Sequence, residues 1–389
     1  MCASRALPET SWKARLEQRI EMKERNAGLD ALRCLSMMMV VMLHVLLHGG
    51  ALRGADLASL SFSTALLWIL EMGSVCAVNC FGMISGYLGV GRRVRVSSML
   101  KQWMQVAFYA AGIYLGWTLV RMNPAKMDGW TQGLRPVTSN MYWYYTSYTC
   151  LCFFMPMLNQ LLESAKRTQL RRALVLLLTV ICAERLFLDS DVFGLDGGYS
   201  MLWLAVLYLM GGYFRLHGEQ SRGYRWLQKH GLWVYAVLAG TVGLYWWART
   251  SGQFAFMGTG ARWIKITAYD NITAVACAVC LFAACSAWQP KGWLKKAAAF
   301  SAPAAFSVYL IHTHPIFWNE ILANRMSDYA SYPLFKMLLC IAAAVAAIFT
   351  ACILVERIRM KAFSMLKIHA ACDALGGWAE RTFSRILGE

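Results

Sequence analysis

The stretch RNAGLDALRCLSMMMVVMLHVLLHGG, residues 25–50, decides the fold, because it is a long apolar segment. It also contains ionisable groups, which bear on the function. A helix needs about 20 predominantly apolar residues to cross a bilayer. Arg33 and His44 stand eleven residues apart within this segment. That spacing is close to a whole number of helical turns and corresponds to a rise of roughly 16 Å, so both side chains share one helix face. Because an ionisable side chain inside a bilayer costs several kcal/mol, the pair predicts a functional polar site.

The composition of the whole chain supports a membrane protein. Of its 389 residues, 58% are hydrophobic and 15% are charged, whereas a soluble domain carries about 25% charged residues. The formal net charge of +17 would suit nucleic acid. However, the Lys and Arg residues fall in short clusters between apolar segments, which is typical of membrane proteins. We therefore expect membrane lipid, and no nucleic acid, among the partners.

Ten apolar segments have approximately the length that crosses a bilayer. They predict an all-α, polytopic transmembrane helical bundle with spans over residues 29–50, 66–90, 99–121, 141–162, 171–188, 199–216, 231–248, 267–287, 302–324 and 334–356. The fifth and sixth spans are short or interrupted. The predicted membrane domain covers residues 29–356, with an N-terminal arm over 1–28 and a tail over 357–389.

Basic residues alternate between the connectors and predict the orientation of the chain. The arm, the even-numbered connectors and the tail carry many Lys and Arg residues, while the first connector has only Arg53 and the fifth is acidic. The seventh connector carries three basic residues, and so does the third when Arg121 at the end of the preceding span is counted, which weakens the contrast. The pattern predicts an even number of spans, both termini in the cytoplasm, and a multi-pass protein of the cytoplasmic (inner) membrane.

The two ends of the chain lack segments that could cross a membrane. Residues 1–28 are charged and polar, without the apolar core or cleavage site of a signal peptide, so we expect no cleavable signal. The tail mixes basic residues with large apolar ones such as Trp378 and Phe383. This mixture suits an amphipathic helix on the inner leaflet, and it suits a short, partly ordered tail equally well.

The first predicted span offers histidines for chemistry. His44 and His48 lie one helical turn apart on the face that also holds Arg33. Zinc would need a third ligand, and the CxxC pair Cys277 and Cys280 has no second pair, so we expect no metal. A neutral imidazole at His44 can take a proton from a hydroxyl group, and it can equally bond to a neighbouring helix. For His48, nearer the outer end, a structural role is favoured.

Charged residues within the predicted spans also have two interpretations each. Arg33 can snorkel to the headgroups or pair with Asp30 three residues earlier. Alternatively, its guanidinium group binds a phosphate, a thioester or a developing oxyanion. Glu71 in the second span and Glu320 in the ninth are candidate buried acids, each as suited to helix packing as to catalysis.

The second predicted span ends in VNCFGMISGYLGVGRRVR, residues 78–95. Its last turns contain four small residues, Ser85, Gly86, Gly89 and Gly91. Small residues let helix backbones approach closely, and we expect the helix to break here. Three basic residues follow at the cytoplasmic mouth, Arg92, Arg93 and Arg95. Such clusters most often anchor a span, but arginine forks also bind the phosphates of a ligand such as coenzyme A.

The ninth predicted span contains SVYLIHTHPIFWNE, residues 307–320. His312 is intramembrane by its position in the span. On a helix, His314 would point about 200° away from it, so the two could not share a ligand. Pro315 predicts a kink in this span.

Four motifs together resemble the integral-membrane acyltransferase family 3. GLDALR (28–33), whose Arg precedes His44, is similar to the family's first-helix signature. CFGMISGYL (80–88) and the arginines after it resemble its SGY-L motif and arginine-containing loop, with Cys in place of the first of two Phe residues. YWYYTSYTCLCFFMPMLN (142–159) resembles its aromatic fourth span, and SVYLIHTHPIFW (307–318) its YLIHxHP segment.

The resemblance implies ten or so membrane helices and the transfer of an acyl group, commonly acetyl, from cytoplasmic acyl-CoA to hydroxyls of cell-surface glycans. It implies catalytic roles for His44 and Arg33, with His44 acting either as a base or as a transient acyl carrier. It implies binding of the donor substrate acyl-CoA (acetyl-CoA) by Arg92, Arg93 and Arg95. We expect no tightly bound cofactor and a glycan or glycolipid acceptor. The supporting candidates are Asp30, Ser85, Glu71 and His312.

Two other functions remain open beside this membrane O-acetyltransferase. A proton-coupled transporter or flippase of the cell-envelope polysaccharide pathway would use His44 in a proton relay and move its substrate unchanged. It would favour inverted repeats, and none stands out in the sequence. A non-catalytic partner in a polysaccharide-synthesis complex would tolerate substitution of Arg33 and His44.

Overall fold

The computed structural model describes residues 25–57, 60–121, 128–187, 191–252 and 268–387, so most of the predicted N-terminal arm lies outside the described residues. Within these ranges the secondary structure is helical and contains no β-strand, which confirms the all-α prediction. The longer helices are α2 (Ala27–Leu47), α3 (Phe62–Ser74), α4 (Ala77–Gly89), α5 (Val96–Arg121), α7 (Trp143–Ser164), α8 (Arg167–Phe187), α9 (Met201–His217), α10 (Arg222–Thr250), α11 (Ile272–Ala287), α14 (Leu334–Met365) and α15 (Ile368–Leu387).

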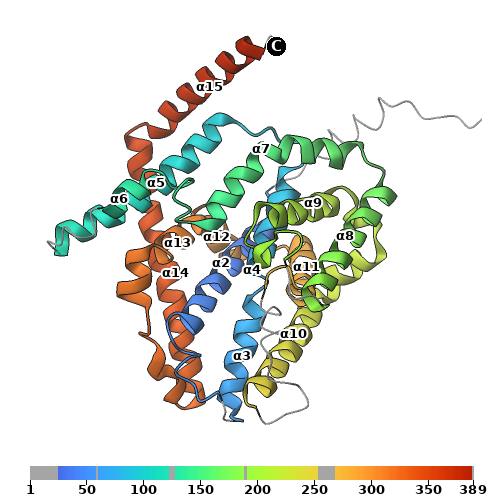
Figure 1. Ribbon diagram of the computed structural model, residues 1–389, viewed down its shortest axis with the longest axis vertical. Coiled ribbons are helices and arrows are strands. Elements are labelled where there is room, and N and C mark those ends of the chain that lie inside the picture. Colours follow the sequence, from blue (N-terminus) through green and yellow to red (C-terminus); the bar gives the residue numbers. More distant parts are fainter. Residues whose placement is uncertain (1–24, 58–59, 122–127, 188–190, 253–267, 388–389) are drawn as a thin grey trace, which may run out of the picture.

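Shorter helical elements connect and interrupt these helices. They are α6 (Asp128–Gly133), η2 (Asp196–Gly198), η3 (Gly218–Gln220), α12 (Gly292–Ser301), η6 (Ala302–Ala304), α13 (Ala305–His312), the π-helical turn η7 (Phe317–Leu322) and η8 (Ser327–Ser331). The helix with the first motif, α2, lies in the middle of the bundle (Figure 1) and contacts α3, α4, α11, α12, α13 and α14. The predicted polar stripe of α2 is therefore surrounded by protein.

The length and hydropathy of the helices bear on the predicted membrane spans. Among the described residues, four helices are long and apolar enough to cross a membrane: Ala27–Leu47, Phe62–Gly89, Arg222–Thr250 and Leu334–Met365. A fifth span results if α11 and the helix Gly292–His312, which meet at 119°, count as one broken span. Predicted spans also coincide with α5, α7, α8 and α9, which do not pass this test. The protein is thus multi-pass, while ten spans and cytoplasmic termini stay predictions.

The start of α2 is anchored to α11. The Asn26 side-chain oxygen accepts a hydrogen bond from the Leu29 N–H (3.0 Å), and its amide donates to the Ser286 carbonyl (2.9 Å). This cap satisfies one of the N–H groups that a helix N-terminus leaves free. At Gly28, a Cβ would lie 2.0 Å from the Cys285 carbonyl oxygen, so only glycine allows this approach. These contacts set the depth of Arg33 and His44 in the bundle.

The small residues of α4 bring it against α9. A Cβ on Gly86 would lie 1.9 Å from the Tyr208 carbonyl oxygen, and one on Gly211 would lie 2.0 Å from the Met83 carbonyl oxygen. The predicted close approach of backbones is confirmed. The predicted break is confirmed too, because α4 ends at Gly89 and Gly91 adopts a φ of 73°.

Substitution of Gly86 by alanine is expected to lower the free energy of unfolding by about 1–3 kcal/mol, the usual range for overpacking. The clashing atom is a backbone carbonyl oxygen, which cannot swing aside as a side chain can. Gly112→Ala on α5 is the matched control, because its Cβ would meet no atom within 4 Å. Thermal unfolding in detergent checks the pair, and equal midpoints would contradict direct packing of α4 on α9.

The ninth span is interrupted beside Pro315, and the interruption is a break between two helical segments. Helix α13 ends at His312, and a new helical segment begins at Pro315. Proline lacks an N–H group and therefore suits the first turn of a helix better than its interior. His314 Nδ1 accepts a hydrogen bond from the Ile316 N–H (3.1 Å), and Nε2–H donates to the Ala110 carbonyl on α5 (3.1 Å). His314 is therefore engaged with α5.

A buried polar network joins α5, α13 and α14. Glu356 is 1% exposed and accepts hydrogen bonds from the Tyr109 hydroxyl (2.7 Å) and from both Nε and NH2 of Arg359 (2.8 and 2.7 Å). Gln105 Nε2 donates to Glu356 (3.1 Å) and to the Ser307 hydroxyl (2.6 Å). This network fixes α13, the helix that carries His312, against its neighbours.

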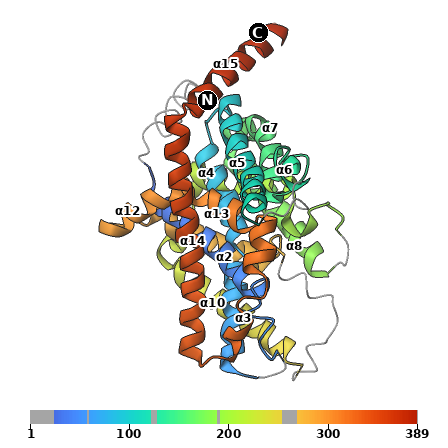
Figure 2. The same cartoon turned by 90° about the vertical axis from the view of Figure 1, so that its left-hand side faces the viewer.

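The tail forms the helix α15, which projects from one end of the bundle beyond α14 (Figure 2). It packs on α5, where Lys101 Nζ donates to Asp373 (2.7 Å) and the Val96 N–H donates to Glu380 (2.8 Å). Lys101 holds the pKa of the Asp373 carboxyl below its usual range. Four large apolar side chains are 53–73% exposed, Leu375, Trp378, Phe383 and Ile386. Of the two forms that the sequence allowed for the tail, the structure shows the helix. Its contact with lipid stays a prediction.

Candidate active site

His44 on α2 and His312 on α13 form a hydrogen-bonded pair. The distance between His44 Nδ1 and His312 Nε2 is 2.8 Å, across 268 residues of sequence. His312 Nδ1 bonds to the Val308 carbonyl oxygen one turn earlier on α13. His312 is fully buried and His44 is half-buried. The sequence identified both histidines separately, and the structure brings them together.

The hydrogen bonds fix the proton positions when both rings are neutral. A carbonyl oxygen only accepts, so His312 Nδ1 carries the proton that is donated to Val308. His312 Nε2 is then the acceptor, and His44 Nδ1–H donates to it. The lone pair of His44 therefore lies on Nε2, the nitrogen that is free to accept another proton.

Trp318 and His48 support the imidazole of His44. The indole ring of Trp318 meets the His44 ring edge-on, with centroids 4.7 Å apart. The His48 ring stacks on Trp318 at 3.9 Å, and its Nε2–H donates to the Trp318 carbonyl (3.0 Å). His48 thus holds Trp318, and Trp318 restricts the orientation of His44. The sequence did not predict Trp318 as a site residue, although Trp318 is the last residue of the SVYLIHTHPIFW motif.

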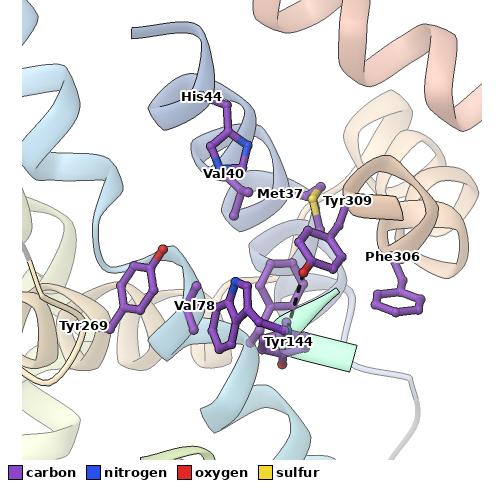
Figure 3. Close-up of a pocket in the computed structure, with 10 residues that line it drawn as sticks. Met37, Val40, His44, Val78, Tyr144, Tyr269, Phe306 and Tyr309 are labelled. Atoms are coloured by element: carbon purple, nitrogen blue, oxygen red, sulfur yellow. Dashed lines mark hydrogen bonds between the residues drawn. The ribbon is translucent and has the colours of Figure 1, made fainter. Parts of the chain in front are cut away.

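His44 lines a small cavity, the aromatic chamber, with a volume of about 50 Å³. Its lining residues are Met37, Val40, His44, Val78, Phe81, Trp143, Tyr144, Tyr269, Phe306 and Tyr309. Figure 3 shows the His44 ring at one end of the chamber and a group of aromatic rings at the other. The Tyr144 N–H donates to the Tyr309 hydroxyl (3.4 Å), which ties two of these walls together.

Arg33 lines a second and larger cavity, the basic cavity, with a volume of about 310 Å³. Its polar and charged lining residues are Arg33, Ser85, Arg92, Arg93, Arg95, Ser98, Gln102, Tyr148 and Tyr208. The side chain of Arg33 is 28% exposed and lies 3.4 Å from Asp30 Oδ1, while Arg25 also pairs with Asp30. The local ion pair is therefore present, and Arg33 still lines a cavity with the three arginines that follow α4.

A stacked pair of tyrosines lies between the two cavities. Tyr148 lines the basic cavity and Tyr144 lines the chamber. Their rings stack with centroids 6.2 Å apart. On α2, the side chains at 33, 37, 40 and 44 follow one helix face. Met37 and Val40, which line the chamber, therefore lie between Arg33 and His44 on this face.

The acidic candidates lie outside both cavities. Glu71 on α3 is buried, lines neither cavity, and has no hydrogen-bond partner for Oε2 within the described part of the chain. Glu320 is exposed, so its prediction as a buried acid is wrong. The physical reason is the break at Pro315, which places the π-helical turn η7 at the surface. No group of three His, Cys, Asp or Glu side chains suited to a metal ion occurs in the described ranges.

The comparison with protein families places the chain among membrane acyltransferases. The model of acyltransferase family 3, described as an acyltransferase domain, matches residues 26–357. The chain therefore belongs to acyltransferase family 3. No curated protein and no solved structure gives a significant match to the chain.

Proposed function

We propose that the protein is an O-acetyltransferase of the cytoplasmic membrane. It transfers an acetyl group from cytoplasmic acetyl-CoA to a hydroxyl group of a glycan or glycolipid of the cell surface. The observation that carries this proposal is the arrangement of two cavities along one face of α2. An arginine-lined cavity lies at Arg33, an aromatic chamber lies at His44, and the stacked rings of Tyr148 and Tyr144 line one cavity each.

The basic cavity suits the nucleotide end of the donor. Arginine guanidinium groups bind phosphate oxygens through paired, charge-assisted hydrogen bonds, and four arginines line this cavity. The helical rise from Arg33 to His44, roughly 16 Å, is comparable to the length of the pantetheine arm. A donor held by its phosphates near Arg33 can therefore present its thioester in the chamber.

His44 is suited to the role of general base. Its Nε2 takes the proton of the acceptor hydroxyl while the hydroxyl oxygen attacks the thioester carbonyl carbon. The tetrahedral intermediate then collapses, the C–S bond breaks, and the leaving thiolate takes the proton from His44. The products are an acetyl ester and free CoA, and the imidazole returns to its neutral form. His312 holds His44 in the tautomer that this step requires.

Membranes from cells with and without the protein test this function. After addition of acetyl-CoA labelled with ¹³C in the acetyl group, we expect labelled acetyl esters on surface glycan only in membranes that contain the protein, with release of CoA. Mass spectrometry of the glycan identifies the acceptor in the same experiment. A transporter or flippase would move glycan without a labelled ester, and that outcome would reject the proposal.

A further inference from the structure

We propose that the aromatic chamber is a filter for acyl length, which holds the acyl group of the donor and admits chains of two or three carbons. This inference rests on the proposed function and adds the residues that set donor specificity. The walls that limit the chain are Met37, Val40, Phe81, Phe306 and Tyr309.

The first argument is size. An apolar cavity of about 150 Å³ holds benzene, which has six non-hydrogen atoms. The chamber, at about 50 Å³, is a third of that size and therefore suits a group of roughly two to four non-hydrogen atoms. An acetyl group has three such atoms and a propionyl group has four, whereas a butyryl group has five and a hexanoyl group seven. Longer chains require the displacement of a wall.

The second argument is polarity and place. Lys, Arg, Asp and Glu are absent from the ten residues that line the chamber. Val78, Phe81 and Phe306 offer the apolar contacts that an acyl chain prefers. The chamber also lies between the Tyr148–Tyr144 pair and His44, where the end of a pantetheine arm would deliver its acyl group.

The third argument is that a second layer of aromatic rings packs against the walls of the chamber. Phe306 packs against Tyr145 and Tyr309, with ring centroids 6.4 and 6.1 Å apart. Tyr309 in turn packs against Tyr142 at 5.8 Å, and the Tyr142 hydroxyl donates to the Leu310 carbonyl (2.9 Å). A wall supported by a second layer of rings cannot yield to extra methylene groups without loss of packing.

A competition between donors tests the filter. Detergent-permeabilised membranes that contain the full chain and its own acceptor receive equal amounts of acetyl-, propionyl-, butyryl- and hexanoyl-CoA, and mass spectrometry counts each ester. One methylene changes the rate in an apolar pocket by about 10- to 200-fold. We expect wild type to favour acetyl over butyryl by about 100-fold or more, and Phe306→Ala to reduce this ratio by about tenfold or more.

The matched control is Phe349→Ala, because Phe349 is buried on α14 and lines neither cavity. It should leave the ratio unchanged. Met37→Ala is the second enlarging variant if Phe306→Ala does not accumulate. Val40→Phe fills the chamber, and we expect it to lose acetyl transfer while radiolabelled CoA still binds.

The outcomes separate the two proposals. If wild type transfers no acyl group from any donor, the proposed function fails and the filter fails with it. If wild type transfers acetyl but both enlarging variants keep its length ratio, only the filter is overturned. Acetyl transfer at the wild-type rate by Val40→Phe would overturn the filter as well.

Discussion

Replacement of His44 by glutamine is expected to slow acetyl transfer by about 10²- to 10⁴-fold, the usual contribution of a general base. Glutamine retains an N–H donor for His312 but has no nitrogen lone pair that takes a proton at neutral pH. The rate of ester formation in permeabilised membranes, normalised to the amount of protein, measures the effect. His230→Gln is the matched control, since His230 is an exposed histidine of α10 that lines neither cavity.

An undiminished rate in His44→Gln would remove His44 from the mechanism. A large fall in rate leaves two roles, because the Nε2 lone pair also suits direct attack on the thioester. Rapid mixing with acetyl-CoA in the absence of acceptor distinguishes them. An acyl carrier releases about one CoA per protein in a burst as acetyl-imidazole forms, whereas a general base releases none.

Much of the central helix could be predicted from the sequence. The spacing of Arg33 and His44 depends only on helical periodicity, and α2 is a continuous helix over both residues. The close approach at the glycines of α4 could be predicted for a similar reason. A residue without a side chain lets another backbone come close, whichever helix provides that backbone.

The contacts of the site could not be predicted in the same way. The His44–His312 bond joins residues 268 positions apart and depends on where α13 stops. Pro315 signals an interruption, but periodicity alone does not distinguish a kinked helix from two helices. The buried Glu356–Arg359 pair also escaped notice, because charges at the end of a predicted span resemble a membrane anchor until the structure shows them buried.

The position of Arg33 favours one of the roles that the sequence left open for it. Because α2 is continuous, the rise to His44 of roughly 16 Å separates the guanidinium group from any oxyanion that forms beside the imidazole. Arg33 shares the basic cavity with Arg92, Arg93 and Arg95 instead. In the proposed mechanism we therefore assign Arg33 to binding the donor.

Replacement of Arg33 by glutamine is expected to raise the KM for acetyl-CoA by about 10- to 100-fold with a smaller change in kcat. A hydrogen bond to a charged group contributes about 1.5–3 kcal/mol, and about 1.4 kcal/mol corresponds to a factor of ten. Any single substitution among Arg92, Arg93 and Arg95 should have less effect, because these side chains are exposed and screened by salt.

Steady-state kinetics over a range of acetyl-CoA concentrations, together with equilibrium binding of CoA, measure the effect of Arg33→Gln. Arg172→Gln is the control, because Arg172 is an exposed arginine of α8 that lines neither cavity. A fall in kcat at unchanged KM and unchanged CoA affinity would place Arg33 at the reacting atoms instead. In that case the donor would have to enter more deeply than the positions of the two cavities suggest.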